Sequence, residues 1–236
     1  MRMITLLVCF FSVLTLKSQP TKTLYLFSGQ GSDARIFSKI TFDSSYKLVN
    51  IQYPIPAKKQ SLREYATLIR SQIDTSSNYS FIGVSLGGMI CSELSEIMHP
   101  QKTIIISSAK CRGELPFRYR FQKNIPLYQI IPKRMIKLGA RVLQPIVEPD
   151  RKNQKAIFKS MLKQKDARFM KRTVAMIVKW NKTNCSPMIY HIHGTKDHTL
   201  PLRKTKPGYV VQNGSHMMTL TRAAEISTLI KEILLK

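Results

Sequence analysis

Acidic residues are scarce in this chain of 236 residues, where 13 Asp and Glu stand against 38 Lys and Arg and the formal net charge is +25. Such an imbalance bears on partners and solubility and leaves the fold open. Internal repeats and low-complexity runs are also missing, which excludes a repeat array. The length and the ordinary 43% hydrophobic content suit one α/β domain with room for an insertion.

Long apolar runs are few, and the most prominent lies at the N-terminus. A short basic start precedes the thirteen apolar-rich residues Ile4–Leu16, and a polar break ending at Pro20 follows them. Thirteen residues are too few to span a bilayer comfortably, whereas this order is typical of a secretory signal peptide. We therefore predict a signal peptide over residues 1–19 and a secreted or periplasmic location. The alternatives are a buried first strand and an uncleaved anchor.

Cysteines are also few, and one of the four, Cys9, lies inside the apolar N-terminal run. Cleavage would leave Cys91, Cys111 and Cys185, and an odd number leaves at least one free thiol. Cys111 follows the C-terminal end of one predicted strand, and Cys185 precedes the N-terminal end of the next. These ends lie at opposite edges of a parallel sheet, so we expect no bridge between Cys111 and Cys185 unless a long insertion brings them together, and we interpret all three cysteines as structural.

Apolar runs alternate with helix-like segments along most of the chain. The strand candidates are Thr23–Ser28, Lys47–Tyr53, Tyr79–Val84, Thr103–Ser108, Met188–His193 and Tyr209–Gln212. The helix candidates are Ser61–Ile73, which opens with a capping box of Ser61 and Glu64, Leu86–Met98 and Thr219–Leu235. The alternation predicts an α/β fold with a mostly parallel, six-stranded sheet and helices on both faces.

One long stretch, residues 112–185, contains no convincing strand. Four helix-like segments fill it: Phe117–Gln122, Pro126–Leu143, Asp150–Lys163 and Asp166–Trp180. Its 19 Lys and Arg against four Asp and Glu give it a net +15 of the total charge. We predict a helical lid at 112–185, inserted between the fourth and fifth strands of a core formed by residues 20–111 and 186–236. The basic surface is either simply solvated or attracts an anionic membrane surface or an acidic substrate.

The chemistry centres on Ser85, within the G-x-S-x-G pentapeptide from Gly83 to Gly87. A predicted strand leads into this pentapeptide and a predicted helix leads away from it. A serine on a sharp strand-to-helix turn needs small residues two positions before and after it, and both glycines meet that demand. The turn would hold the hydroxyl at the C-terminal edge of the sheet, before a helix N-terminus that favours developing negative charge.

A serine nucleophile needs a base, and the base needs an orienting acid. Asp197 lies just past one predicted strand and His216 lies in the loop after the next. Asp150 and Asp166 compete with Asp197 but fall in the lid. His198 competes with His216 but adjoins the acid, so we favour His216. His193 is interpreted as a turn-bracing residue, and no third ligand accompanies His191 and His193 to form a metal site.

The order Ser85, Asp197, His216, with each residue at a strand's C-terminal end, resembles the α/β-hydrolase family from about Thr23 to Lys236. The resemblance implies that Ser85 attacks, His216 acts as base and Asp197 orients it. It also implies an oxyanion hole formed by the backbone N–H groups of Gln30 and Leu86. The usual antiparallel first two strands are missing, so we expect a compact six-stranded version.

These features predict a serine hydrolase that cleaves a small carboxylic ester with an apolar acyl group, without metal or cofactor. Thioesterase, lactonase and acyltransferase chemistry stay open, because a fold does not fix a substrate. The alternative of another class is a non-catalytic protein whose basic lid binds anionic lipid or nucleic acid. No nucleic-acid motif occurs in the sequence, which disfavours nucleic acid as a partner.

Overall fold

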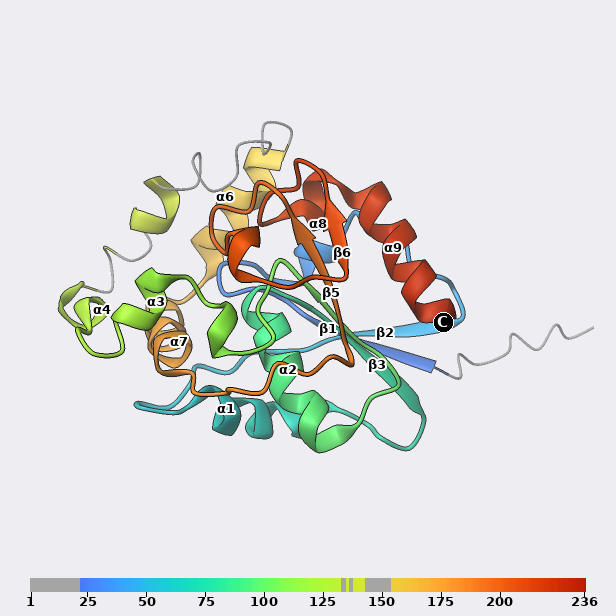
Figure 1. The fold of residues 1–236 in the computed structure, drawn as a ribbon, viewed down its shortest axis with the longest axis horizontal. Coiled ribbons are helices and arrows are strands. Elements are labelled where there is room, and N and C mark those ends of the chain that lie inside the picture. The colour runs from blue at the N-terminus through green and yellow to red at the C-terminus, as the bar shows by residue number, and fades with distance from the viewer. Residues whose placement is uncertain (1–21, 133–134, 136–137, 143–153) are drawn as a thin grey trace, which may run out of the picture.

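Six strands form one sheet, and every neighbouring pair in it is parallel. This sheet is the centre of a computed structural model that describes residues 22–132, 135, 138–142 and 154–236 (Figure 1). The strands are β1 (Lys22–Phe27), β2 (Tyr46–Asn50), β3 (Asn78–Val84), β4 (Thr103–Ile106), β5 (Ile189–Gly194) and β6 (Tyr209–Val211). Their spatial order, β2-β1-β3-β4-β5-β6, confirms the predicted compact sheet of six parallel strands.

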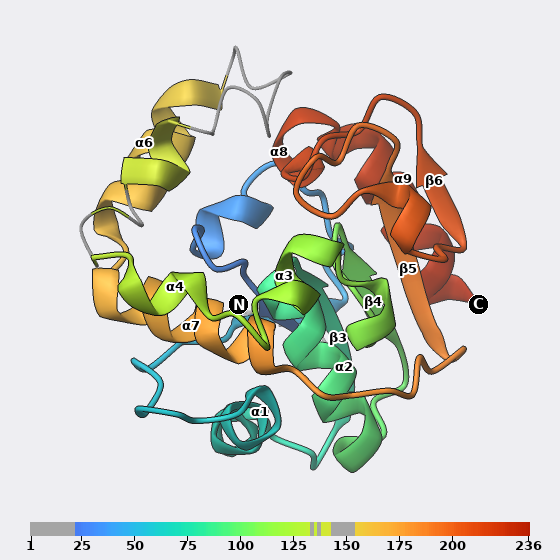
Figure 2. The same cartoon turned by 60° about the vertical axis from the view of Figure 1, so that its left-hand side comes forward.

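Helices cover both faces of the sheet, with α1 (Leu62–Ile69) on one side of the strands and α9 (Ala223–Leu235) on the other (Figure 2). Tyr25 and Phe27 of β1 pack into the apolar cluster that includes α1 and α2 (Leu86–Met98). Leu24 and Leu26 point the other way and pack with α9. Because successive strand residues face opposite sides, each strand supplies both halves of the core.

The helix boundaries follow local sequence signals. Ser61 and Glu64 form a reciprocal capping box at the start of α1, as predicted. The helix after Ser85 has the predicted bounds, Leu86–Met98. The predicted C-terminal helix is divided at Arg222 into α8 (Met218–Thr221) and α9.

Between β4 and β5 the chain is helical, which confirms the predicted absence of strands there within the described residues. The helices are α3 (Phe117–Phe121), α4 (Leu127–Ile130), α6 (Lys155–Gln164) and α7 (Ala167–Lys179), with residues 138–142 also helical. We call residues 112–185 the insertion. Its helix α7 joins the main core through Phe169, Met176 and Trp180, and the Trp180 indole donates to Glu93 Oε1 at 2.6 Å.

Parts of three predictions fall on residues 1–21, 133–134, 136–137 and 143–153, which lie outside the described part of the chain. They are the signal peptide at residues 1–19, part of the predicted helix at Pro126–Leu143 and the beginning of the predicted helix at Asp150–Lys163. Within the described residues, no helix combines the length and apolar character needed to cross a membrane.

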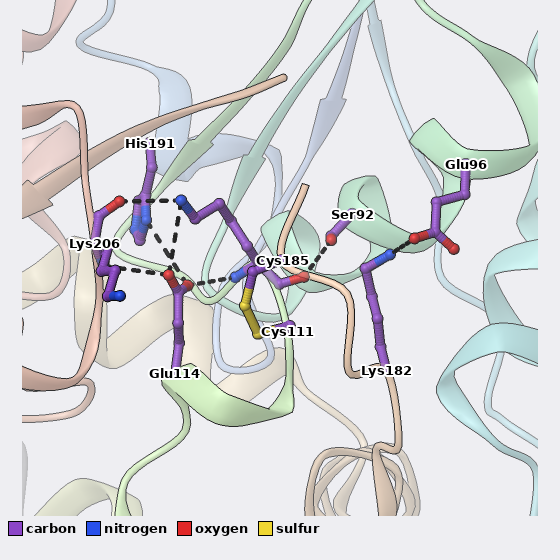
Figure 3. The surroundings of a disulfide bond; sticks show 9 residues. Ser92, Glu96, Cys111, Glu114, Lys182, Cys185, His191 and Lys206 are labelled. Atoms are coloured by element: carbon purple, nitrogen blue, oxygen red, sulfur yellow. Dashed lines mark hydrogen bonds and ion pairs between the residues drawn. A yellow bond between two sulfur atoms is a disulfide. The ribbon is translucent and has the colours of Figure 1, made fainter. Parts of the chain in front are cut away.

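Cys111 and Cys185 form a disulfide with their Cα atoms 5.0 Å apart, so the insertion does bring together the two cysteines that the sheet edges alone would keep apart. Figure 3 shows the bond between the start and the end of the insertion. Cys91 is buried and is the free thiol of the described residues.

The sheet-edge argument failed because both cysteines lie on connecting segments that approach each other beside α2. After β4 the chain turns along α2, where the Lys110 carbonyl accepts from Ser92 Oγ at 2.6 Å. On its way back to β5, the chain passes the same place, where the Lys182 carbonyl accepts from Arg112 N at 2.8 Å and the Lys182 ammonium pairs with Glu96. β4 has only four residues, so the distance between the two edges of the sheet is short.

Candidate active site

Ser85 occupies a strained turn between β3 and α2. Its backbone has φ 54° and ψ −118°, a conformation that residues other than glycine rarely adopt. The two flanking glycines are required by close backbone packing. A Cβ atom on Gly83 would lie 2.6 Å from the Gly87 carbonyl carbon, and a Cβ on Gly87 would lie 2.1 Å from Phe27 O. The turn is further held by Ser108 Oγ, which donates to the Ser85 carbonyl at 2.6 Å.

The structure brings Ser85, His216 and Asp197 into one hydrogen-bonded chain. His216 Nε2 lies 2.9 Å from Ser85 Oγ, and His216 Nδ1 lies 2.8 Å from Asp197 Oδ2. A carboxylate only accepts, so Nδ1 carries the proton and Nε2 is left to accept from the serine hydroxyl. The three residues follow β3, β5 and β6, whose carboxyl ends meet at one edge of the parallel sheet.

Asp197 is held as a carboxylate in a buried position. Its Oδ1 accepts from the backbone N–H groups of Thr199 at 2.8 Å and Leu200 at 2.7 Å. Burial raises the pKa of Asp197, but His216, His193 and the Leu200 N–H together outweigh it, and the net pKa lies below its ordinary value. The acid therefore stays ionised while it fixes the orientation of the imidazole.

A second histidine pair lies behind the acid. His193 Nε2 donates to the Leu200 carbonyl at 2.7 Å and lies 3.5 Å from Asp197 Oδ2, so His193 does brace this loop. Its Nδ1 then accepts from His191 Nε2 at 2.9 Å. Burial lowers the pKa of both rings, so both are neutral at physiological pH. Their alternate spacing on β5 is the sequence signal that places them on one face.

Sequence reasoning missed Glu114, which links the insertion to the strands behind the site (Figure 3). Its buried carboxylate accepts from Lys110 N at 2.7 Å and from Lys206 N at 3.2 Å. It also lies 3.8 Å from Lys110 Nζ and 4.0 Å from His191 Nδ1. A single acidic residue in a basic segment carries no motif, so only the folded path of the chain reveals this role.

The predicted oxyanion residues flank Ser85. Leu86 opens α2, where the first N–H groups of a helix have no intrahelical acceptor. Gln30 lines the same pocket as Ser85, and its side-chain amide donates to Met170 O at 2.9 Å and Thr173 Oγ1 at 2.7 Å. The loop before it is braced by Ser32 Oγ, which accepts from Gly29 N at 2.9 Å. The insertion thus anchors the side chain of Gln30.

A pocket of about 520 Å³ opens over Ser85 and His216. The insertion supplies most of its apolar wall: Tyr119, Ala140, Phe158, Leu162, Met170 and Ile177. Burial raises the pKa of the Tyr119 phenol, which is therefore neutral in this wall. The pocket suits a small molecule with an apolar portion and a polar group at the serine.

The competing acid and base candidates lie elsewhere or have other partners. Asp166 caps α7 by accepting from Arg168 N and Phe169 N. His198 lines the pocket, and its carbonyl accepts from Arg118 at 3.2 Å. Asp150 lies outside the described residues. In the described ranges, no group of three or more His, Cys, Asp or Glu side chains is arranged to hold a metal ion.

Comparison with known proteins identifies the fold. No family model matches the chain, and no curated protein matches its sequence. Solved structures do match. An esterase from Thermogutta terrifontis has a TM-score of 0.71 and 9% identity over 92% of this chain and 90% of its own. The enol-lactonase from Burkholderia xenovorans LB400 has a TM-score of 0.71 and 12% identity over 92% of each chain.

An esterase from Exiguobacterium antarcticum is similar at a TM-score of 0.65 and 14% identity, over 90% of this chain and 91% of its own. At such low identities the likeness establishes the architecture alone. The chain therefore has the α/β-hydrolase fold, over nearly the full length of the solved proteins.

Proposed function

We propose that the protein is a serine hydrolase that cleaves a carboxylic ester with an apolar acyl group. The observation that carries this proposal is the unbroken chain from Ser85 Oγ through His216 to a buried, ionised Asp197. The apolar wall of the pocket beside Ser85 supports the acyl preference. Esterases and a lactonase with the same fold support hydrolysis as the reaction class.

In the first half-reaction, Ser85 Oγ attacks the acyl carbon while His216 Nε2 takes its proton. The carbonyl oxygen becomes negative and accepts from the backbone N–H groups of Gln30 and Leu86. His216 then gives its proton to the departing alkoxide, and the acyl group stays on Ser85. Asp197 remains ionised throughout and stabilises the imidazolium.

The second half-reaction repeats these roles with water. His216 takes a proton from water as the water oxygen attacks the acyl carbon of the acylated Ser85. The bond to Ser85 Oγ breaks, His216 returns a proton to that oxygen, and the acid leaves. Thioester and lactone substrates would follow the same steps, because only the leaving group differs.

A fluorophosphonate probe and the Ser85→Ala variant test this function. We expect the probe to label the parent protein on Ser85, and we expect Ser85→Ala to lose labelling and about 10⁶-fold in ester turnover. Ser95→Ala is the matched control, because Ser95 lies on α2, the helix that Ser85 precedes, and its hydroxyl donates to the Ser92 carbonyl within that helix. Turnover by Ser85→Ala above a tenth of the parent rate would exclude Ser85 as the nucleophile.

We further propose that the protein acts outside the cytoplasm. The order of basic, apolar and polar residues over 1–19 supports export, and so does the Cys111–Cys185 disulfide, because such bonds persist in oxidising compartments. Fractionation of the native host, with mass spectrometry of the N-terminus, tests this. An intact Met1 on a cytoplasmic protein would overturn it.

A further inference from the structure

Exposed apolar side chains concentrate on one part of the insertion. Ile130 is 79% exposed, Phe117 67% and Val142 63%. Nine of the 15 large apolar side chains that are exposed in the described residues fall within residues 117–142: Phe117, Phe121, Ile125, Leu127, Ile130, Ile131, Met135, Leu138 and Val142. We call these nine the apolar face. Single exposed apolar residues are ordinary, but such a concentration marks an interaction surface.

The apolar face lies at the end of the molecule that carries α3 and α4, away from the C-terminus (Figure 1, Figure 2). Two sets of contacts hold it to the rest of the protein. Lys171 Nζ donates at 2.8 Å to the carbonyls of Gln129 and Ile131, which ties α4 to α7. Arg118 donates to the carbonyls of His198 and Thr199, which ties α3 to the loop beside Asp197.

The charged side chains in the segment that carries the apolar face are all basic. Residues 115–132 and 138–142 contain no Asp or Glu, and they include four basic residues: Arg118, Arg120, Lys123 and Arg141. Aliphatic side chains interspersed with cations are the composition of a surface that enters the headgroup region of an anionic bilayer.

A basic groove of about 390 Å³ runs beside the apolar face, and α4 lines it with Tyr128 and Gln129. Its cationic lining residues are Lys58, Lys59, Arg168, Lys171, Arg172 and Lys179. No acidic side chain lines this groove. The positive field therefore extends past the apolar residues to Lys58 and Lys59 of the core, where it attracts anionic headgroups.

We infer that the apolar face and the basic groove dock the protein on a lipid bilayer that contains anionic lipids. A second copy of this chain fits less well, because a two-fold interface would set two strongly cationic surfaces against each other. Nucleic acid also fits less well, because seven of the nine apolar residues are aliphatic or Met, whereas single strands are bound by aromatic stacking.

Docking at this face would place the candidate active site at the membrane. Tyr119 and Ala140 belong to the same segment as the apolar face, and both line the pocket over Ser85. An ester that partitions into lipid would therefore meet the pocket without first crossing bulk water. The docking itself does not depend on the proposed hydrolase function, since binding can be measured with the Ser85→Ala variant.

Co-sedimentation with vesicles tests the inference. The full chain is expressed with its N-terminal segment in a host that can export proteins, and mass spectrometry reads the N-terminus of the product. Phosphatidylcholine vesicles with about 30% phosphatidylglycerol should bind the protein at low salt and lose it as salt rises, because exposed charges are screened over about 8–10 Å at physiological ionic strength. Vesicles of phosphatidylcholine alone should bind it much less.

Two pairs of variants make the test specific. Leu127→Ser with Ile130→Ser should weaken binding about tenfold, because both side chains lose their apolar burial in the bilayer. Leu68→Ser with Leu235→Ser is the matched control, since these residues are 50% and 76% exposed outside the insertion. The control should bind within about twofold of the parent.

Lys123→Gln with Arg141→Gln should weaken binding about thirtyfold, from about 1 kcal/mol for each cation at an anionic surface. Lys39→Gln with Lys231→Gln, two exposed lysines elsewhere, is the control for this pair. No binding to anionic vesicles at low salt would overturn the inference, as would equal losses in test and control variants. Light scattering that shows a dimer which the Leu127 and Ile130 substitutions dissociate would assign the face to a second copy instead.

Discussion

Breaking the Cys111–Cys185 disulfide should cost the protein several kcal/mol of stability. The bond joins residues 74 apart in sequence. In the chain-entropy model, releasing a loop of that length returns about 15 cal/mol/K to the unfolded chain, or about 4.5 kcal/mol at 25 °C. For a protein of this size, such a change corresponds to a fall of roughly 10 °C in the melting temperature. The native contacts of the insertion need not change for this loss to occur.

Urea unfolding of the parent, with and without reductant, measures the effect. The Cys111→Ser/Cys185→Ser variant should match the reduced parent and show no further response to reductant. Cys91→Ala is the control, because it removes the buried free thiol and keeps the disulfide, so its response to reductant should persist. Equal free energies of unfolding for the oxidised and reduced parent would refute the reasoning. So would a reductant response in the double variant.

Two further predictions concern the turn and the buried histidines. Gly83→Ala should destabilise the protein by several kcal/mol, since the new Cβ would lie 2.6 Å from the Gly87 backbone. Gly208→Ala is the control and should be tolerated, because a Cβ at Gly208 would have no neighbour within 4 Å. Equal melting temperatures for the two variants would contradict this prediction. Burial lowers the pKa of His191 and His193 below their unfolded value of about 6.5, so the unfolded state binds more protons below that pH. The free energy of unfolding should therefore be insensitive to these two rings above about pH 6.5. Below that pH it should fall by up to about 1.4 kcal/mol per pH unit for each ring, until the pH reaches the folded pKa. A free energy of unfolding that stays constant from pH 7 to pH 5 would refute this prediction.

Local rules account for the parts of the fold that the sequence predicts well. The alternation of apolar strands and amphipathic helices fixes the six-stranded parallel sheet, because each pattern has its own period. The capping box at Ser61 and the glycines around Ser85 are read directly from short spacings. The expected meeting of Ser85, Asp197 and His216 needs only one topological rule, that the carboxyl ends of parallel strands share an edge.

Features that depend on the path of the chain through the insertion cannot be predicted from sequence patterns. The pairing of Cys111 with Cys185 requires the return segment to pass beside α2, which no local pattern encodes. The same holds for Glu114, whose partners Lys110 and Lys206 come from different connections. The anchoring of Gln30 by α7 also joins residues about 140 apart. These contacts are set by long-range packing, for which spacing gives no signal.

The short distance between Cys111 and Cys185 also makes the insertion an exchangeable module. Its two ends leave the core at one point, with Cα atoms 5.0 Å apart, so a segment of different length can replace it without moving β4 or β5. The entropy of closing such a loop grows only slowly with its length. Ser85, Asp197 and His216 all lie outside this module, whereas most of the apolar pocket wall lies inside it. Substrate preference can therefore diverge by exchange of the module while the reacting groups stay in place.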